Sequence, residues 1–103
     1  MPSASEIKAR LRSISPVEDK TYYVEDAFAT ALSRIEEALK SVCESLEVVD
    51  VDGVEMVDET EAGGIWESHA MVKCDDTLFR VSIRAETNWI YEMTFPEVEE
   101  IRE

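Results

Sequence analysis

The sequence has few of the residues from which most catalytic and nucleic-acid-binding sites are built. Its 103 residues include one histidine, two cysteines, three glycines and three prolines, and ten basic side chains against 24 acidic ones. The formal net charge is therefore −14, and phosphate binding needs a basic face that this composition does not supply. We expect no direct binding of nucleic acid and none of anionic membranes.

Long apolar runs are also lacking. No window approaches the roughly 18 apolar residues of a membrane-spanning helix, and the first residues, MPSASEIKARLRS, lack the apolar core of a signal peptide. We therefore expect a cytoplasmic protein. The 45% of hydrophobic residues favours one packed domain over residues 1–103 rather than a disordered acidic tail.

The two cysteines, Cys43 and Cys74, lie 31 positions apart and match no zinc or redox spacing. We expect two reduced thiols that face the core, because an unpaired cysteine usually behaves as a small buried hydrophobe. A disulfide between them is the alternative.

Catalytic and cofactor signatures are weak. His69, the single histidine, falls on the polar face of a predicted strand with no nucleophile at an obvious spacing, and Gly63-Gly64 is not followed by a phosphate-binding lysine. The acidic turn around Asp52 does not match the EF-hand pattern. We predict a protein that is not an enzyme, with no catalytic residues, cofactor or metal site.

Two helices are predicted in the first half. Ser3 and Glu6 have the spacing of a capping box, at the start of a weakly basic helical segment over residues 1–20 with a net charge of +1. An amphipathic helix is predicted over residues 21–46, where apolar side chains recur at helical spacing. Ser15-Pro16 either begins this second helix or forms a turn before it.

From residue 46 to residue 95 the apolar period changes to two, which predicts an antiparallel sheet of about five strands. Asp52-Gly53 is a strong hairpin signal that would place Asp50 opposite Glu55. An Asp75-Asp76 turn would place Val72 opposite Phe79, Ala70 opposite Val81 and Glu67 opposite Arg84. A three-residue loop, Glu86-Thr87-Asn88, would place Ile83 opposite Tyr91.

The predicted fold class is α+β: two N-terminal helices, then a meander sheet with the long helix packed on its apolar face. Pro96 should end the last strand, and residues 96–103 form an acidic tail or a short helix. The predicted core comprises Phe28, Leu32, Ile35, Leu39, Trp66, Val72, Phe79, Val81, Ile83, Tyr91 and Phe95.

The charge is unevenly distributed along the chain, because residues 21–103 have a net charge of −15. We interpret this as a non-enzymatic module that binds a protein with a basic surface, since complementary charge gives fast, steered association. In charge and size the chain resembles the small acidic inhibitors of phages, the anti-restriction and anti-CRISPR proteins, which imitate nucleic acid. The predicted partner-binding residues are Asp50, Glu55, Asp58, Glu59, Glu61, Glu67 and Glu92.

Two alternatives stay open. The acid excess is also typical of a halophilic housekeeping or regulatory domain, whose carboxylates need counterions at high salt. An acidic secretion or assembly chaperone, which is typically dimeric, has the same helix-on-sheet body. A homodimer is therefore a second assembly to consider.

Overall fold

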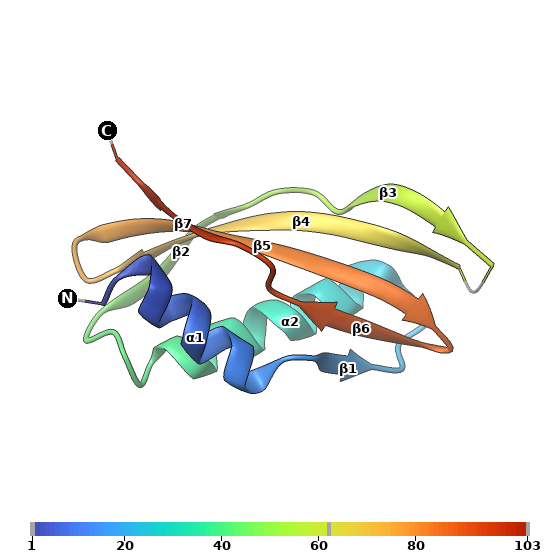
Figure 1. Cartoon of the computed structure of the whole chain (residues 1–103), viewed down its shortest axis with the longest axis horizontal. Helices are drawn as coiled ribbons and strands as arrows, with labels where there is room; N and C mark the ends of the chain where they lie inside the picture. Colours follow the sequence, from blue (N-terminus) through green and yellow to red (C-terminus); the bar gives the residue numbers. More distant parts are fainter. Residues whose placement is uncertain (1, 62, 103) are drawn as a thin grey trace.

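The computed structural model describes residues 2–61 and 63–102, and it has two layers (Figure 1). Two helices cover one face of an antiparallel seven-stranded sheet, which confirms the predicted α+β class. The elements in chain order are α1 (Ala4–Ile14), β1 (Val17–Asp19), α2 (Val24–Leu39), β2 (Leu46–Val51), β3 (Glu55–Thr60), β4 (Gly63–Cys74), β5 (Thr77–Asn88), β6 (Ile90–Thr94) and β7 (Val98–Ile101).

A long hairpin of β4 and β5, twelve residues each, forms the centre of the sheet. Its register is the predicted one, with Val72 opposite Phe79 and Glu67 opposite Arg84. Asp75 takes the left-handed conformation in the turn, with φ of 55°. Each long strand has two short neighbours placed one after the other: β2 and β3 pair with β4, and β6 and β7 pair with β5. The strand β1 lies outside β6.

The predicted hairpin at Asp52-Gly53 is wrong, because β2 and β3 both run antiparallel to β4. Between β2 and β3 the chain remains hydrogen-bonded to β4. The Asp52 backbone N–H donates to the His69 carbonyl at 2.9 Å, and the Ser68 hydroxyl donates to the Asp52 carbonyl at 2.7 Å. Two short strands in line pair most of the long edge of β4, whereas a β2–β3 hairpin would leave half of that edge unpaired.

The hairpin between β5 and β6 also differs from prediction. Its turn is centred on Trp89, so that Tyr91 lies opposite Thr87 rather than Ile83. The two registers differ by four residues, and an even shift keeps the same side chains on the buried face, so apolar patterning could not separate them. In the observed register Tyr91 packs edge to face on Trp66, with ring centroids 5.6 Å apart.

The C-terminal segment forms a strand instead of the short helix considered as one outcome. Pro96 follows β6 as expected, and the chain then resumes pairing as β7, with Val98 opposite Val81 and Glu99 opposite Arg80. β6 pairs with β5 only as far as the Arg84–Thr94 pair, so the rest of that edge of β5 would have unpaired backbone groups. These groups can hydrogen-bond to another strand, and β7 supplies it. For the same reason, Val17–Asp19 form β1 on the edge of β6 rather than a second helix start.

The core lies between the helices and the inner face of the sheet. Ile7 and Leu11 of α1 are fully buried, and Arg10 donates through Nε to the Ala38 carbonyl at 3.1 Å near the end of α2. The predicted capping box of Ser3 and Glu6 is present. Of the predicted core, Leu32, Trp66 and Tyr91 are partly buried, and the remaining residues are buried: Phe28, Ile35, Leu39, Val72, Phe79, Val81, Ile83 and Phe95.

The expectation of two reduced thiols is wrong, because Cys43 and Cys74 form a disulfide. Both residues are buried. The pairing of Leu46 with Cys74 brings the segment after α2 to the end of β4, and the two Cα atoms are 5.4 Å apart. Sequence spacing alone could not reveal this contact, since it depends on how the helix layer is placed on the sheet.

Candidate protein-binding face of the sheet

The outer face of the sheet, opposite the helices, carries mostly polar and charged side chains, with Ile65, Met71, Leu78 and Ile90 among them. The ladder pair His69–Ser82 divides it near the two strand breaks. We call the part beyond this pair, towards the Trp89 turn, the acidic end: residues 18–23, 55–61, 63–67 and 84–92. The rest of the described chain is the disulfide end.

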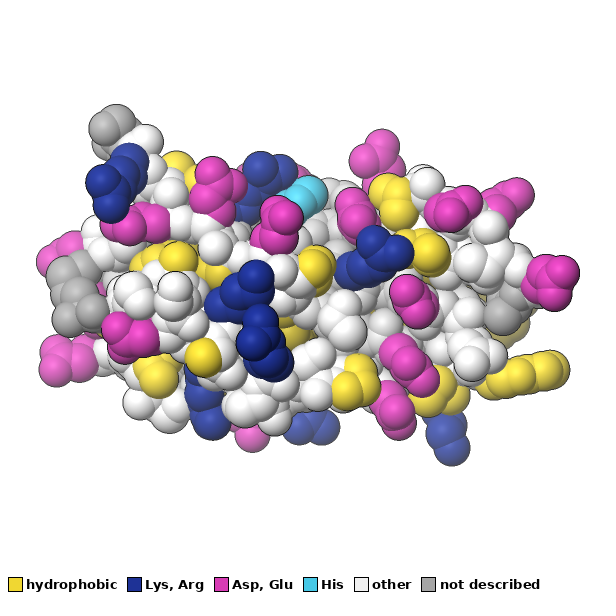
Figure 2. Space-filling view, viewed as in Figure 1, with side chains coloured by type: hydrophobic (Ala, Val, Ile, Leu, Met, Phe, Trp, Pro, Cys, Tyr) yellow, Lys and Arg dark blue, Asp and Glu magenta, His cyan; other side chains and the backbone are white. Residues whose placement is uncertain are grey.

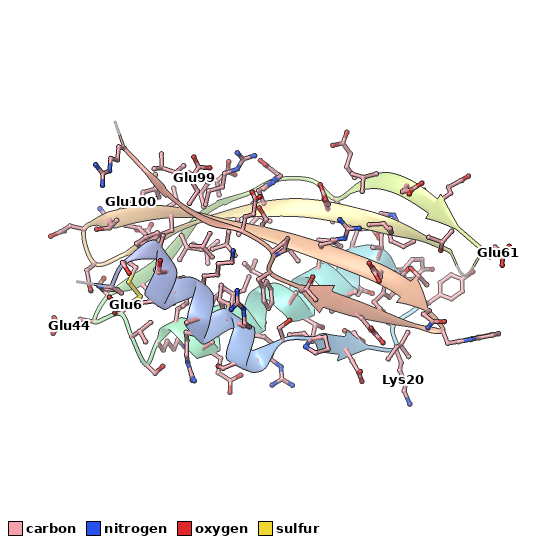
Figure 3. The ribbon with its side chains drawn as sticks, viewed as in Figure 1. Glu6, Lys20, Glu44, Glu61, Glu99 and Glu100 are labelled. Atoms are coloured by element: carbon pink, nitrogen blue, oxygen red, sulfur yellow. A yellow bond between two sulfur atoms is a disulfide. The ribbon has the colours of Figure 1, made fainter. Side chains whose placement is uncertain are left out.

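The acidic end is dense in charge of one sign. Its 27 residues hold nine acidic and two basic side chains, a net charge of −7, which is half of the chain's −14. The two basic residues are Lys20 and Arg84; the chain's other eight basic residues belong to the disulfide end. In Figure 2, acidic side chains gather over the right-hand end, and Figure 3 places Glu61 at that extremity.

Carboxylates lie opposite one another in the ladders of this end. Glu92 of β6 is the ladder partner of Glu18 on β1 and of Glu86 on β5, so three adjacent strands each present a glutamate in one row. Neighbouring strands lie about 4.8 Å apart. A second pair joins Glu55 to Glu67. Like charges directly opposite destabilise a sheet, so these rows do not serve stability.

Arg84, one of the two basic residues of the acidic end, lies among its carboxylates. Its guanidinium lies 3.8 Å from a carboxylate oxygen of Glu67 and 3.8 Å from one of Glu86, and the arginine side chain is 40% exposed. Such exposed pairs contribute less than about 1 kcal/mol. Among residues 2–61 and 63–102, no ion pair includes Glu18, Glu55 or Glu92.

At the disulfide end the same face pairs opposite charges. Lys73 is the ladder partner of Glu47, and Arg80 is the ladder partner of Glu99. Cross-strand pairs of opposite charge stabilise a sheet by about 0.2–1 kcal/mol. Apart from the Glu67–Arg84 pair, the ladders of the acidic end therefore place like charges opposite one another, whereas those of the disulfide end place opposite charges together.

The structure brings six of the seven predicted partner-binding residues to the acidic end: Glu55, Asp58, Glu59, Glu61, Glu67 and Glu92. Asp50 lies on β2 opposite Met71, at the disulfide end, so the predicted Asp50–Glu55 pairing is wrong. Sequence reasoning missed Glu18 and Glu86, the two neighbours of Glu92. The correct β5–β6 register would have found Glu86, whereas Glu18 depends on the unforeseen strand β1.

A shallow hollow of about 230 Å³ lies at the boundary between the ends, lined by Glu67, His69, Ser82, Ile83, Arg84, Pro96 and Glu97. His69 Nδ1 is 3.6 Å from an Asp52 carboxylate oxygen, and Ser82 is the ladder partner of His69. Within the described ranges, no hydrogen bond joins the Ser82 hydroxyl to His69. The cluster therefore lacks the contact by which a base activates a nucleophile.

The described part of the chain has neither a metal-binding cluster nor a membrane-spanning helix. No group of three or more histidine, cysteine, aspartate or glutamate side chains there is placed to hold a metal ion. None of the helices there has the length and apolar character needed to cross a membrane. No family model, curated protein or solved structure matches the chain.

Proposed function

We propose that the protein is a non-enzymatic binding module whose acidic end occupies a basic, nucleic-acid-binding surface of another protein. Its concrete form is an inhibitor that imitates nucleic acid, of the anti-restriction or anti-CRISPR kind. The observation that carries the proposal is the row Glu18–Glu92–Glu86, in which three adjacent strands set carboxylates opposite one another. In the part of the chain that the structure describes, Glu18 and Glu92 have no ion-pair partner.

The spacing of these charges suits such a target. Carboxylates carried on neighbouring strands, whose backbones lie about 4.8 Å apart, approach the charge density of one nucleic-acid strand, about one phosphate per 3.4 Å of axis. A site built to neutralise phosphates with arginine and lysine side chains can therefore pair with this row. Complementary charge also speeds diffusional encounter, more strongly at low salt.

The charge pattern does not set the compartment or the oligomeric state. The cytoplasmic location stays a prediction, and the Cys43–Cys74 disulfide weighs against it because disulfides persist mainly in oxidising compartments. A homodimer would have to form away from the acidic end, where two equal charges repel each other.

The test is affinity capture from the source organism's lysate at low salt, followed by elution with duplex DNA or with RNA. We expect nucleic acid to displace a captured protein, because both ligands compete for one basic surface. The triple variant Glu18→Gln, Glu86→Gln, Glu92→Gln should weaken capture about tenfold or more, since each lost charge contact removes a fraction of the binding free energy.

The matched control is Glu36→Gln, Glu37→Gln, Glu44→Gln, which removes the same number of charges from the helix layer and the loop that follows it. Control and wild type should capture the partner equally. Equal losses in both triple variants would show that only total charge matters, and a captured protein that nucleic acid does not displace would contradict the proposal.

A further inference from the structure

Trp89 has the largest exposed fraction of the large hydrophobic side chains in the described residues. It lies at the tip of the β5–β6 hairpin and is 97% exposed, so it contributes almost nothing to the core. A tryptophan is the largest apolar side chain a protein can leave in water, and folding does not account for its place here.

The backbone conformation of Trp89 is also unfavourable for a residue with a side chain. Trp89 has φ of 69°, in the left-handed region that favours glycine or asparagine. A residue with a side chain costs about 1–2 kcal/mol in that conformation relative to the right-handed one. Both packing and backbone conformation would favour a smaller residue, so the stability of the fold does not account for the indole.

The surroundings of Trp89 are aromatic and acidic. Tyr22 is 87% exposed and packs edge to face on Tyr23, with ring centroids 5.1 Å apart. These tyrosines follow β1, whose last residue, Asp19, pairs with Tyr91, so they lie towards the same end of the sheet as the Trp89 turn. The Glu86–Glu92 pair lies within three residues of Trp89 on either strand.

We propose that Trp89 stacks on an arginine guanidinium of the partner, while the Glu86–Glu92 row holds the basic side chains beside it. This inference rests on the proposed function and names the chemistry that the acidic end recognises. A cation over an indole face is attracted by the ring quadrupole, most strongly for tryptophan and most often with arginine. Neighbouring carboxylates raise the local concentration of such cations.

A second copy of this chain is the wrong occupant. The acidic end has a net charge of −7, so two acidic ends brought together would repel each other. An apolar pocket of a partner could bury the indole. Without cations it would desolvate the neighbouring glutamates and leave them without counter-charges, which costs free energy. An arginine-bearing segment satisfies the ring and the carboxylates together.

The test uses a short arginine-rich peptide and an isosteric peptide with citrulline in place of arginine. In a Trp66→Phe background Trp89 is the only tryptophan, and its fluorescence should change and saturate as the arginine peptide is added. Trp89→Leu and Trp89→Gly should each weaken binding about tenfold, Trp89→Phe should weaken it less, and citrulline should abolish it.

The outcomes separate this inference from the proposed function. If Trp89→Leu binds as tightly as wild type while the Glu18, Glu86, Glu92 triple variant does not, the stacking role of Trp89 is overturned and the proposed function stands. If the triple variant also binds normally, or wild type does not bind at low salt, both are overturned. Trp89→Gly should unfold at the same or a higher urea concentration than wild type, so a loss of binding cannot be ascribed to misfolding.

Discussion

The disulfide end and the acidic end share one sheet and differ in how their side chains are paired and exposed. At the disulfide end, Lys73 and Arg80 oppose acids across the ladders, and Arg10 ties α1 to the last turn of α2. At the acidic end, Glu92 lies opposite Glu18 and Glu86, and Trp89 is exposed to solvent.

The difference separates stability from binding within a single small domain. The buried disulfide and both fully buried residues of α1, Ile7 and Leu11, stabilise one end. The other end retains repelling charges and an exposed indole, features that lower stability or leave it unchanged. Sites where a stabilising rule is broken without local compensation are where function is expected.

The largest effect should come from breaking the disulfide. The double variant Cys43→Ser, Cys74→Ser should lose about 3–4 kcal/mol in the free energy of unfolding, because a cross-link spanning 31 residues restricts the unfolded chain. Urea unfolding followed by circular dichroism measures this. Binding of the arginine peptide should not change under conditions where the variant is folded. A loss below about 1 kcal/mol would show that this end does not depend on its cross-link.

A smaller effect should come from Arg10→Met, which keeps the apolar stem and removes the guanidinium. The Ala38 carbonyl then loses the guanidinium as a donor and keeps the Ser41 hydroxyl, which donates to it at 2.9 Å. The helix has no basic residue in its last turn, so the free energy of unfolding should still fall, by about 1 kcal/mol or less. Arg12→Met, an exposed position on the same helix, is the matched control in the same urea experiment. Equal changes in both would contradict a specific role for Arg10.

The smallest effects should have opposite signs at the two ends. Glu92→Gln relieves repulsion from Glu18 and Glu86 and should raise the free energy of unfolding by about 0.5 kcal/mol, whereas Glu99→Gln removes the partner of Arg80 and should lower it by about 0.5 kcal/mol. Urea unfolding at low salt measures both, and at high salt both differences should shrink. If both variants changed the free energy of unfolding in the same direction, the two ends would not differ in how their charges affect stability.

Much of the fold could be predicted from local patterns. The capping box at Ser3, the stripe of α2 and the full register of the β4–β5 hairpin follow from short-range chemistry and alternation. The predicted register of the β5–β6 hairpin, with Ile83 opposite Tyr91, was wrong because an even shift leaves the same side chains on the apolar face. The Asp52-Gly53 signal failed because the long edge of β4 competed for both flanking strands.

The candidate site was predictable only in part, for the same physical reason. Sequence charge alone pointed to Glu92 and to the acids around β3, but not to their neighbours Glu18 and Glu86, which depend on which strands lie side by side. Composition and periodicity determined an acidic α+β domain with an unevenly distributed charge. The tertiary structure decided that carboxylates oppose one another at one end, and that Cys43 meets Cys74 at the other. Those contacts join residues distant in sequence, and packing of the whole chain sets them.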